Sequence, residues 1–212
     1  MRRGLSDYTL HDAAKVDDAA WAAIARLAPD PRVVAIGETG LDYDRVFSPI
    51  PDQLVNLRRN LDLAVASGKP AILHCRSRAG ERDAQDALLG EVRARPGLKL
   101  VIHSFSGPID YAESMLELGA SISISGLAFR AGEESTAEVA RLVPEGRLLV
   151  ETDSPYLSPP GAPRGRNAPE WVGLTAAWVA GQRGDAPGAA GDALVAAYEV
   201  TFPRHRDIVR PA

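Results

Sequence analysis

Short apolar runs that alternate with longer amphipathic stretches constrain this 212-residue chain more than any other feature of its sequence. Short runs that are rich in β-branched residues and bounded by Gly or Pro predict buried strands. Five such runs are present, at residues 33–36, 71–73, 100–102, 122–124 and 148–150. Their alternation with helical segments predicts right-handed βαβ units, and therefore an α/β fold with a parallel sheet.

The segments between these runs carry apolar residues at helical spacing. The clearest is 51–67, where Pro51 suits a first helical turn and Gly68 suits a C-cap. Its predicted buried face consists of Leu54, Leu57, Leu61, Ala64 and Val65. Similar patterns predict helices at about 17–28, 84–92, 109–116 and 139–143, and two more helices from Pro169 onward.

Composition excludes several classes of protein. The net charge of −4 offers no basic surface for nucleic acid, although bound divalent ions can supply positive charge locally. The single cysteine, Cys75, rules out an intramolecular disulfide. Because no apolar run is long enough to cross a membrane and no signal peptide is evident, we expect a cytoplasmic protein without a membrane partner.

Residues that can bind a metal ion follow four of the five predicted strands. They are Glu38, His74, His103, and Asp153 at the end of the run Glu151-Thr152-Asp153. A lone His or Glu at such a place is more often structural. Four at equivalent strand ends favour a metal site, because the carboxyl ends of parallel strands gather at one face. Two imidazoles and two carboxylates suit Zn²⁺, Mn²⁺ or Mg²⁺.

Four motifs carry a resemblance to a known family. They are Ile36–Tyr43 (IGETGLDY), Pro70–Arg76 (PAILHCR), Val101–Gly107 (VIHSFSG) and Leu149–Pro159 (LVETDSPYLSP). In order and spacing they resemble the TatD family of metal-dependent DNases, from about residue 8 to residue 202. The resemblance implies a single domain over residues 1–212 with a TIM-type (β/α) barrel fold. It also implies hydrolysis of phosphodiester bonds in DNA, of the 3′ exonuclease type.

The resemblance also implies roles for individual residues. Glu38 would bridge two divalent metal ions, His74 and His103 would bind one of them, and Asp153 would bind the other and act as the base. Glu38 and Asp153 are therefore the predicted catalytic residues. Arg76, Ser104 and Asn167 are the predicted substrate-binding residues, with a surface salt bridge as the alternative for Arg76.

The sequence departs from the family pattern at its start. The family begins with a strand that carries His-x-His, and no such pair occurs among the four histidines here. The resemblance thus implies that the first two strands and most of the third are missing, the third beginning at residues 6–11. His11 is not predicted to be a ligand, and His205 is expected to be solvated.

Five strands cannot close an eight-stranded barrel, so two exposed strand edges are expected, through which the chain could form a homo-oligomer. Two alternatives to a DNase stay open. One is a metal-dependent hydrolase of a small ester, amide or lactone, because the same ligand set serves those reactions in related barrels. The other is a catalytically impaired remnant, because the second metal site would keep only Glu38 and Asp153.

Overall fold

A computed structural model describes residues 10–163 and 166–202 of the chain. These residues form two compact units. The N-terminal unit ends at Val101 and also takes in Phe202, and the C-terminal unit runs from Ile102 to Thr201. The prediction of a single domain stays a prediction.

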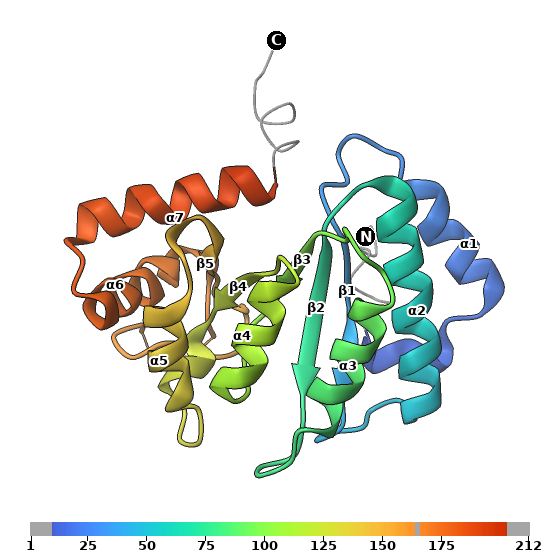
Figure 1. The fold of residues 1–212 in the computed structure, drawn as a ribbon, viewed down its shortest axis with the longest axis horizontal. Helices are drawn as coiled ribbons and strands as arrows, with labels where there is room; N and C mark the ends of the chain where they lie inside the picture. The colour runs from blue at the N-terminus through green and yellow to red at the C-terminus, as the bar shows by residue number, and fades with distance from the viewer. Residues whose placement is uncertain (1–9, 164–165, 203–212) are drawn as a thin grey trace. The chain divides into compact units, whose positions relative to one another are not determined.

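The N-terminal unit is built from two parallel strands and the helices that flank them (Figure 1). Helix α2 packs against β1, and α3 contacts both strands. In chain order its elements are the 3-10 helix η2 (Leu10–Lys15), α1 (Asp18–Leu27), β1 (Ile36–Asp42), α2 (Ile50–Ser67), β2 (Ala71–Arg76) and α3 (Asp83–Arg93). Of the segment expected to begin a third family strand, the described part is therefore η2 and not a strand.

Helix α2 confirms the helix predicted at 51–67. It ends at Gly68, whose left-handed φ of 65° lets its N–H reach the carbonyls of Ala64 and Val65. Leu57 and Leu61 are fully buried, which stabilises the unit by about 1.5–3 kcal/mol for each side chain. The prediction that Val65 is buried was wrong, because its side chain is 52% exposed.

The buried face of α2 is rotated relative to the predicted one and includes polar side chains. Gln53, Asn56 and Asn60 are buried beside the leucines. Gln53 hydrogen-bonds to the backbone of Asp42 at the end of β1, donating to its carbonyl and accepting from its N–H. This face of the helix therefore anchors the loop that follows β1 as well as filling the core.

Strand β1 lies further along the chain than predicted. The apolar run predicted a strand at 33–36, whereas the strand is Ile36–Asp42, within the Gly-Glu-Thr-Gly-Leu-Asp motif. Gly and Asp have low strand propensity, so pairing with β2 decides the conformation. The register changes between Ile36 and Thr39, so β1 has an irregularity at Glu38.

Gly40 allows β1 and β2 to approach closely. It pairs with His74 of β2 and has a φ of 147°, a conformation that L side chains rarely adopt. A Cβ atom at this position would lie 1.9 Å from the carbonyl oxygen of His74. The position of β2 at His74 thus depends on a residue without a side chain.

Strand β3 (Leu100–Ile102) runs across the boundary between the units. In the C-terminal unit, β4 (Ser121–Ile124) pairs in parallel with β5 (Leu148–Val150), which confirms the strands predicted there. The other elements are α4 (Ile109–Glu117), η3 (Gly126–Phe129), α5 (Ser135–Leu142), η4 (Glu145–Arg147), η5 (Pro169–Trp171), α6 (Val172–Arg183) and α7 (Pro187–Thr201). Within the described ranges, no helix has the length and apolar character needed to cross a membrane.

Candidate metal centre

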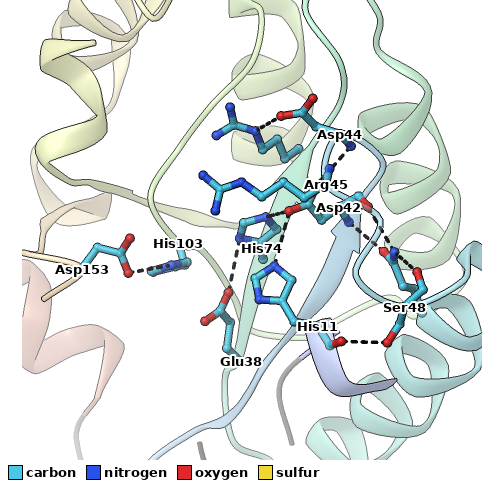
Figure 2. Close-up of polar contacts among 11 residues, drawn as sticks. His11, Glu38, Asp42, Asp44, Arg45, Ser48, His74, His103 and Asp153 are labelled. Atoms are coloured by element: carbon cyan, nitrogen blue, oxygen red, sulfur yellow. Dashed lines mark hydrogen bonds and ion pairs between the residues drawn. The ribbon is translucent and has the colours of Figure 1, made fainter. Parts of the chain in front are cut away.

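Glu38 and His74 come together in the N-terminal unit. Glu38 lies at the irregularity of β1, and its Oε1 is 3.3 Å from Nδ1 of His74 on β2 (Figure 2). Both side chains are partly exposed, at 28% and 19%. The strand-end prediction was imprecise for both residues, because Glu38 and His74 lie inside β1 and β2 and not at their ends.

Asp42 lies on the other side of the His74 ring and is almost completely buried, with 1% of its side chain exposed. Its Oδ1 accepts hydrogen bonds from the backbone N–H groups of Asp44 and Arg45, at 3.1 and 2.8 Å. Its Oδ2 is 3.6 Å from Nε2 of His74 and 3.4 Å from Nε2 of His11 (Figure 2). The carboxylate therefore faces two imidazoles with one oxygen and the backbone with the other.

The environment of Asp42 favours the charged carboxylate. Burial by itself raises the pKa of Asp42, because a low-dielectric surrounding disfavours charge. The contacts from His11 and His74 and the backbone N–H of Arg45 outweigh burial, so the pKa falls far below its ordinary value. A buried, charged Asp42 is thus a fixed acceptor for imidazole N–H groups.

His11 reaches this cluster from η2, which packs against β1 and α2. Its ring meets that of His74 edge-on, with centroids 5.7 Å apart. The Oγ atom of Ser48 donates to the His11 carbonyl and accepts from Ala14 N–H, which fixes η2 to the loop after β1. Together, ligand atoms of His11, Asp42 and His74 lie within 4.8 Å of one another.

In the C-terminal unit, His103 lies between two carboxylates. It follows β3, and its Nδ1 is 2.8 Å from Oε1 of Glu151, the residue that follows β5. Its Nε2 is 3.8 Å from Oδ1 of Asp153 (Figure 2). Glu151 is held in turn by Ser123 of β4, whose hydroxyl donates to Oε2 at 2.8 Å. The two histidines thus share a pattern, with a carboxylate near each ring nitrogen.

Strained backbone occurs in the loops that carry these residues. Positive φ values are found at Asp153 (54°), at Ser104 beside His103 (46°), and at Val46 in the loop after β1 (48°). Such conformations are costly for residues other than glycine, most of all for β-branched ones, and they concentrate at functional sites.

The predicted substrate-binding residues have partners within the protein. Arg76 forms an ion pair with Asp44 at 2.8 Å, which matches the alternative considered for it. Ser104 is buried, with its Oγ 2.6 Å from that of Ser125. Asn167 is also buried and donates from Nδ2 to two backbone carbonyls of the Asp153 loop. Their roles in substrate binding stay predictions, and His205 lies outside the described residues.

Sequence reasoning missed the part played by Asp42, Glu151 and His11. A signal for two of them was present in the spacing. Asp42 is four residues after Glu38, and Asp153 is two residues after Glu151. In extended backbone such as β1, an even separation places side chains on one face, so the motif of Glu38 offers two acidic groups to one imidazole. The same spacing after β5 brings Glu151 and Asp153 to His103, although the backbone of Asp153 is left-handed. His11 gave no comparable signal, because η2 meets β1 only in the folded unit.

The donor set fits a divalent metal ion. Two ligands of a tetrahedral ion with bonds of about 2.0–2.1 Å lie about 3.3–3.4 Å apart. The 3.3 Å between Glu38 Oε1 and His74 Nδ1 matches this separation, while the 3.8 Å between His103 Nε2 and Asp153 Oδ1 is slightly larger. Nitrogen and oxygen donors of this kind suit Zn²⁺ or Mn²⁺, and the structure fixes neither the identity nor the number of ions.

Parallel strands alternating with helices, with imidazole–carboxylate pairs at the strands, define a metal-hydrolase type of α/β protein. Comparison with known proteins makes the assignment specific, because residues 9–203 match the family model described as TatD related DNase. The chain therefore belongs to the TatD family. A relative from Erwinia billingiae, named 3′-5′ ssDNA/RNA exonuclease TatD, is 38% identical over 191 residues, covering 85% of this chain and 70% of the relative.

Other comparisons agree. A protein of the same name from Klebsiella pneumoniae is 37% identical over 185 residues, covering 82% of this chain and 67% of its own length. The crystal structure of the TatD homologue YjjV from Escherichia coli superposes with a TM-score of 0.80 at 26% identity, covering 92% of this chain and 74% of that one. A TatD family hydrolase from Entamoeba histolytica, at 21% identity and a TM-score of 0.74, has the same fold.

The predicted fold class, an α/β fold of the TIM-barrel type with parallel strands, is confirmed by these comparisons. The described residues contain five strands, whereas a complete barrel of this type has eight.

Proposed function

We propose that this chain is a divalent-metal-dependent nuclease that hydrolyses phosphodiester bonds of single-stranded DNA or RNA and removes nucleotides from the 3′ end. Family membership and the names of the 37–38% identical relatives support the reaction class. The single observation that carries the proposal is the 3.3 Å contact between Glu38 and His74, two donors with the separation expected of ligands to one ion.

Glu38 and His74 in the N-terminal unit, and His103 and Asp153 in the C-terminal unit, are the proposed metal ligands. When bound, divalent ions would supply hydroxide at neutral pH and stabilise charge on the phosphate. Metal charge is also what a chain of net charge −4 needs in order to attract a nucleic-acid backbone.

Asp153 is the proposed general base. Its side chain is 30% exposed, so a water molecule can reach its carboxylate, and His103 lies 3.8 Å away to help orient it. The left-handed backbone at Asp153 fixes the direction of the side chain, and Asn167 holds that loop by donating to the carbonyl of Thr152. Asp153 would accept the proton of the attacking water, and Arg76, released from Asp44, would bind a substrate phosphate.

The proposal is tested with single-stranded oligonucleotides that carry a fluorophore at either end. Removal from the 3′ end would release labelled mononucleotide from the 3′-labelled strand and give a ladder of shortened products from the 5′-labelled strand. Both products should require Mn²⁺ or Mg²⁺ and stop with a chelator. Release of the 5′ label first, or turnover of only small carboxylic esters, would contradict the proposal.

A further inference from the structure

We propose that the loop after β1, residues 43–49, holds the nucleic-acid strand beside the proposed metal ligands of the N-terminal unit. Phe47 would stack on an unpaired base, and Arg45 would pair with a backbone phosphate. The inference rests on the proposed function, because it concerns how the substrate strand is held at that site. It goes further in assigning the choice of unpaired bases to this loop, since a base inside a duplex offers no free face to a phenyl ring.

Phe47 exposes an aromatic ring close to the histidines. It is 63% exposed, and its ring meets that of His11 nearly at a right angle, with centroids 5.0 Å apart. His11 in turn meets His74 with centroids 5.7 Å apart, so one imidazole separates Phe47 from a proposed metal ligand. Proteins that bind single strands stack bases on aromatic rings exposed in this way.

The loop is held so that Phe47 stays at the surface. A single exposed apolar residue is common and by itself indicates no function. Here, however, Asp42 accepts two backbone N–H groups at the start of the loop, and Gln53 donates to the carbonyl of Ser48 at its end. Between them Val46 has a left-handed φ of 48°, which is costly for a β-branched residue and typical of functional loops.

Arg45 supplies positive charge from the same loop. Figure 2 shows its side chain extending from the loop to the side of the cluster on which His74 and Glu38 lie. Arg45 is exposed, and within the described part of the chain its guanidinium has no hydrogen bond or ion pair. Arg76, by contrast, must first leave Asp44, which lies 2.8 Å away. Because a guanidinium can bind phosphate through two N–H groups, Arg45 is the cation that is ready to do so.

The stacking role is tested with the full chain and two 3′-labelled single strands. One strand is oligothymidylate, and the other has the same backbone but carries abasic sites at its 3′-terminal nucleotides. Phe47→Ala should lower kcat/KM on oligothymidylate by about 5–150-fold, the range measured for loss of one base–aromatic stack. On the abasic strand the same substitution should change kcat/KM by less than about twofold, because no base is present to lose the contact.

Two further substitutions separate stacking from packing against His11. Phe47→Trp keeps an aromatic face and should retain activity, whereas Phe47→Leu keeps apolar contact but no aromatic face and should resemble Phe47→Ala. Val55→Ala truncates another apolar side chain of the same unit, which is 49% exposed, and should behave like the wild type. Equal losses of Phe47→Ala on both strands, or full activity of Phe47→Leu, would overturn the stacking role.

The phosphate contact of Arg45 is tested by the salt dependence of binding. Fluorescence anisotropy of labelled oligothymidylate, with Ca²⁺ in place of Mn²⁺ to slow hydrolysis, gives the affinity at several salt concentrations. Arg45→Gln should reduce the slope of log affinity against log salt by about 0.7, the value for one phosphate contact to a single strand. Arg26→Gln, at an exposed arginine of α1, is the charge-matched control and should leave the slope unchanged. Equal slopes for Arg45→Gln and the wild type would overturn this contact.

Binding and cleavage together separate this inference from the proposed function. A chain that binds oligothymidylate through Phe47 and Arg45 but releases no nucleotide would contradict the proposed function and leave the binding loop in place. A chain that releases nucleotides at the same rate with Phe47→Ala and Arg45→Gln would remove the binding loop alone. A wild-type chain that neither binds nor cleaves single strands would overturn both.

Discussion

Because β1 and β2 approach closely at Gly40, we expect Gly40→Ala to destabilise the fold by an amount that can be calculated from the structure. A Cβ atom there would lie 1.9 Å from the carbonyl oxygen of His74 and 2.8 Å from its carbonyl carbon and nitrogen. Since real Cβ contacts essentially never fall below 3.0 Å, backbone must move by about 1 Å or more. Overpacking of this kind costs about 1–3 kcal/mol, and the backbone conformation adds about 1–3 kcal/mol for alanine.

Gly40→Ala is therefore expected to lower the free energy of unfolding by about 2–6 kcal/mol, a large share of the 5–15 kcal/mol that is typical of folded proteins. For a chain of this size, a mid-range loss of about 4 kcal/mol lowers Tm by about 8–16 °C. Because the displaced atoms belong to His74, metal affinity should fall in any fraction that stays folded. Thermal unfolding followed by circular dichroism, with and without Zn²⁺, measures both effects.

Gly90→Ala is the matched control. Gly90 lies inside α3, is exposed, and has no atom within 4 Å of an added Cβ. Alanine in a helix is favoured over glycine by about 0.5–1 kcal/mol, so this variant should be slightly more stable than the wild type. If Gly40→Ala unfolded within a degree or two of Gly90→Ala, the argument from the β1–β2 approach would be refuted.

Three further predictions concern buried or paired polar groups. The hydrogen bond from Arg58 lowers the pKa of Glu91, so the ionised Glu91 stabilises the fold above its ordinary pKa, and this contribution is lost as the pH falls through the lowered pKa of the folded state. Glu91→Gln should lower the free energy of unfolding in urea by about 0.5–1 kcal/mol at pH 7, and a difference that persisted undiminished at about pH 3 would be contrary evidence. Lys69→Met should lower the free energy of unfolding by about 2–4 kcal/mol, because it leaves the carbonyls of Ala28 and Asp30 without their charged donor. The exposed control Lys99→Met should change Tm little, and equal effects of the two variants would count against this role of Lys69. Asn167→Ala removes two hydrogen bonds that hold the Asp153 loop, and should lower the free energy of unfolding by about 1–3 kcal/mol. Nuclease activity should fall even at temperatures where the variant is folded, and full activity there would argue against a role for these hydrogen bonds.

The alternation of apolar runs and amphipathic segments was sufficient to predict the α/β class and the bounds of α2, because Pro51 and Gly68 mark its ends by local chemistry. Strand β1 was misplaced because its Gly-Glu-Thr-Gly-Leu-Asp segment has few apolar residues. It becomes a strand through pairing with β2, a contact between residues more than thirty positions apart. The burial of Gln53 has the same origin, since its partner is the backbone of Asp42.

The candidate ligands were accessible to sequence reasoning because their chemical types recur beside the strands in a family order. Glu38 and His74 meet in the N-terminal unit, and His103 and Asp153 face each other in the C-terminal unit. The other carboxylates beside the two imidazoles, Asp42 and Glu151, were signalled only by their spacing. Gln53 holds the backbone of Asp42 beside the ring of His74, and periodicity does not encode that contact.

Metal-dependent nuclease activity of the purified chain is the most direct test of the central claim. The comparison is between wild type, Glu38→Gln and the exposed control Glu81→Gln, with a 3′-labelled single strand and Mn²⁺. We expect the wild type and the control to release labelled mononucleotide at equal rates, and Glu38→Gln to be at least about 100-fold slower. Cleavage that survived a chelator, or that Glu38→Gln retained in full, would contradict the account.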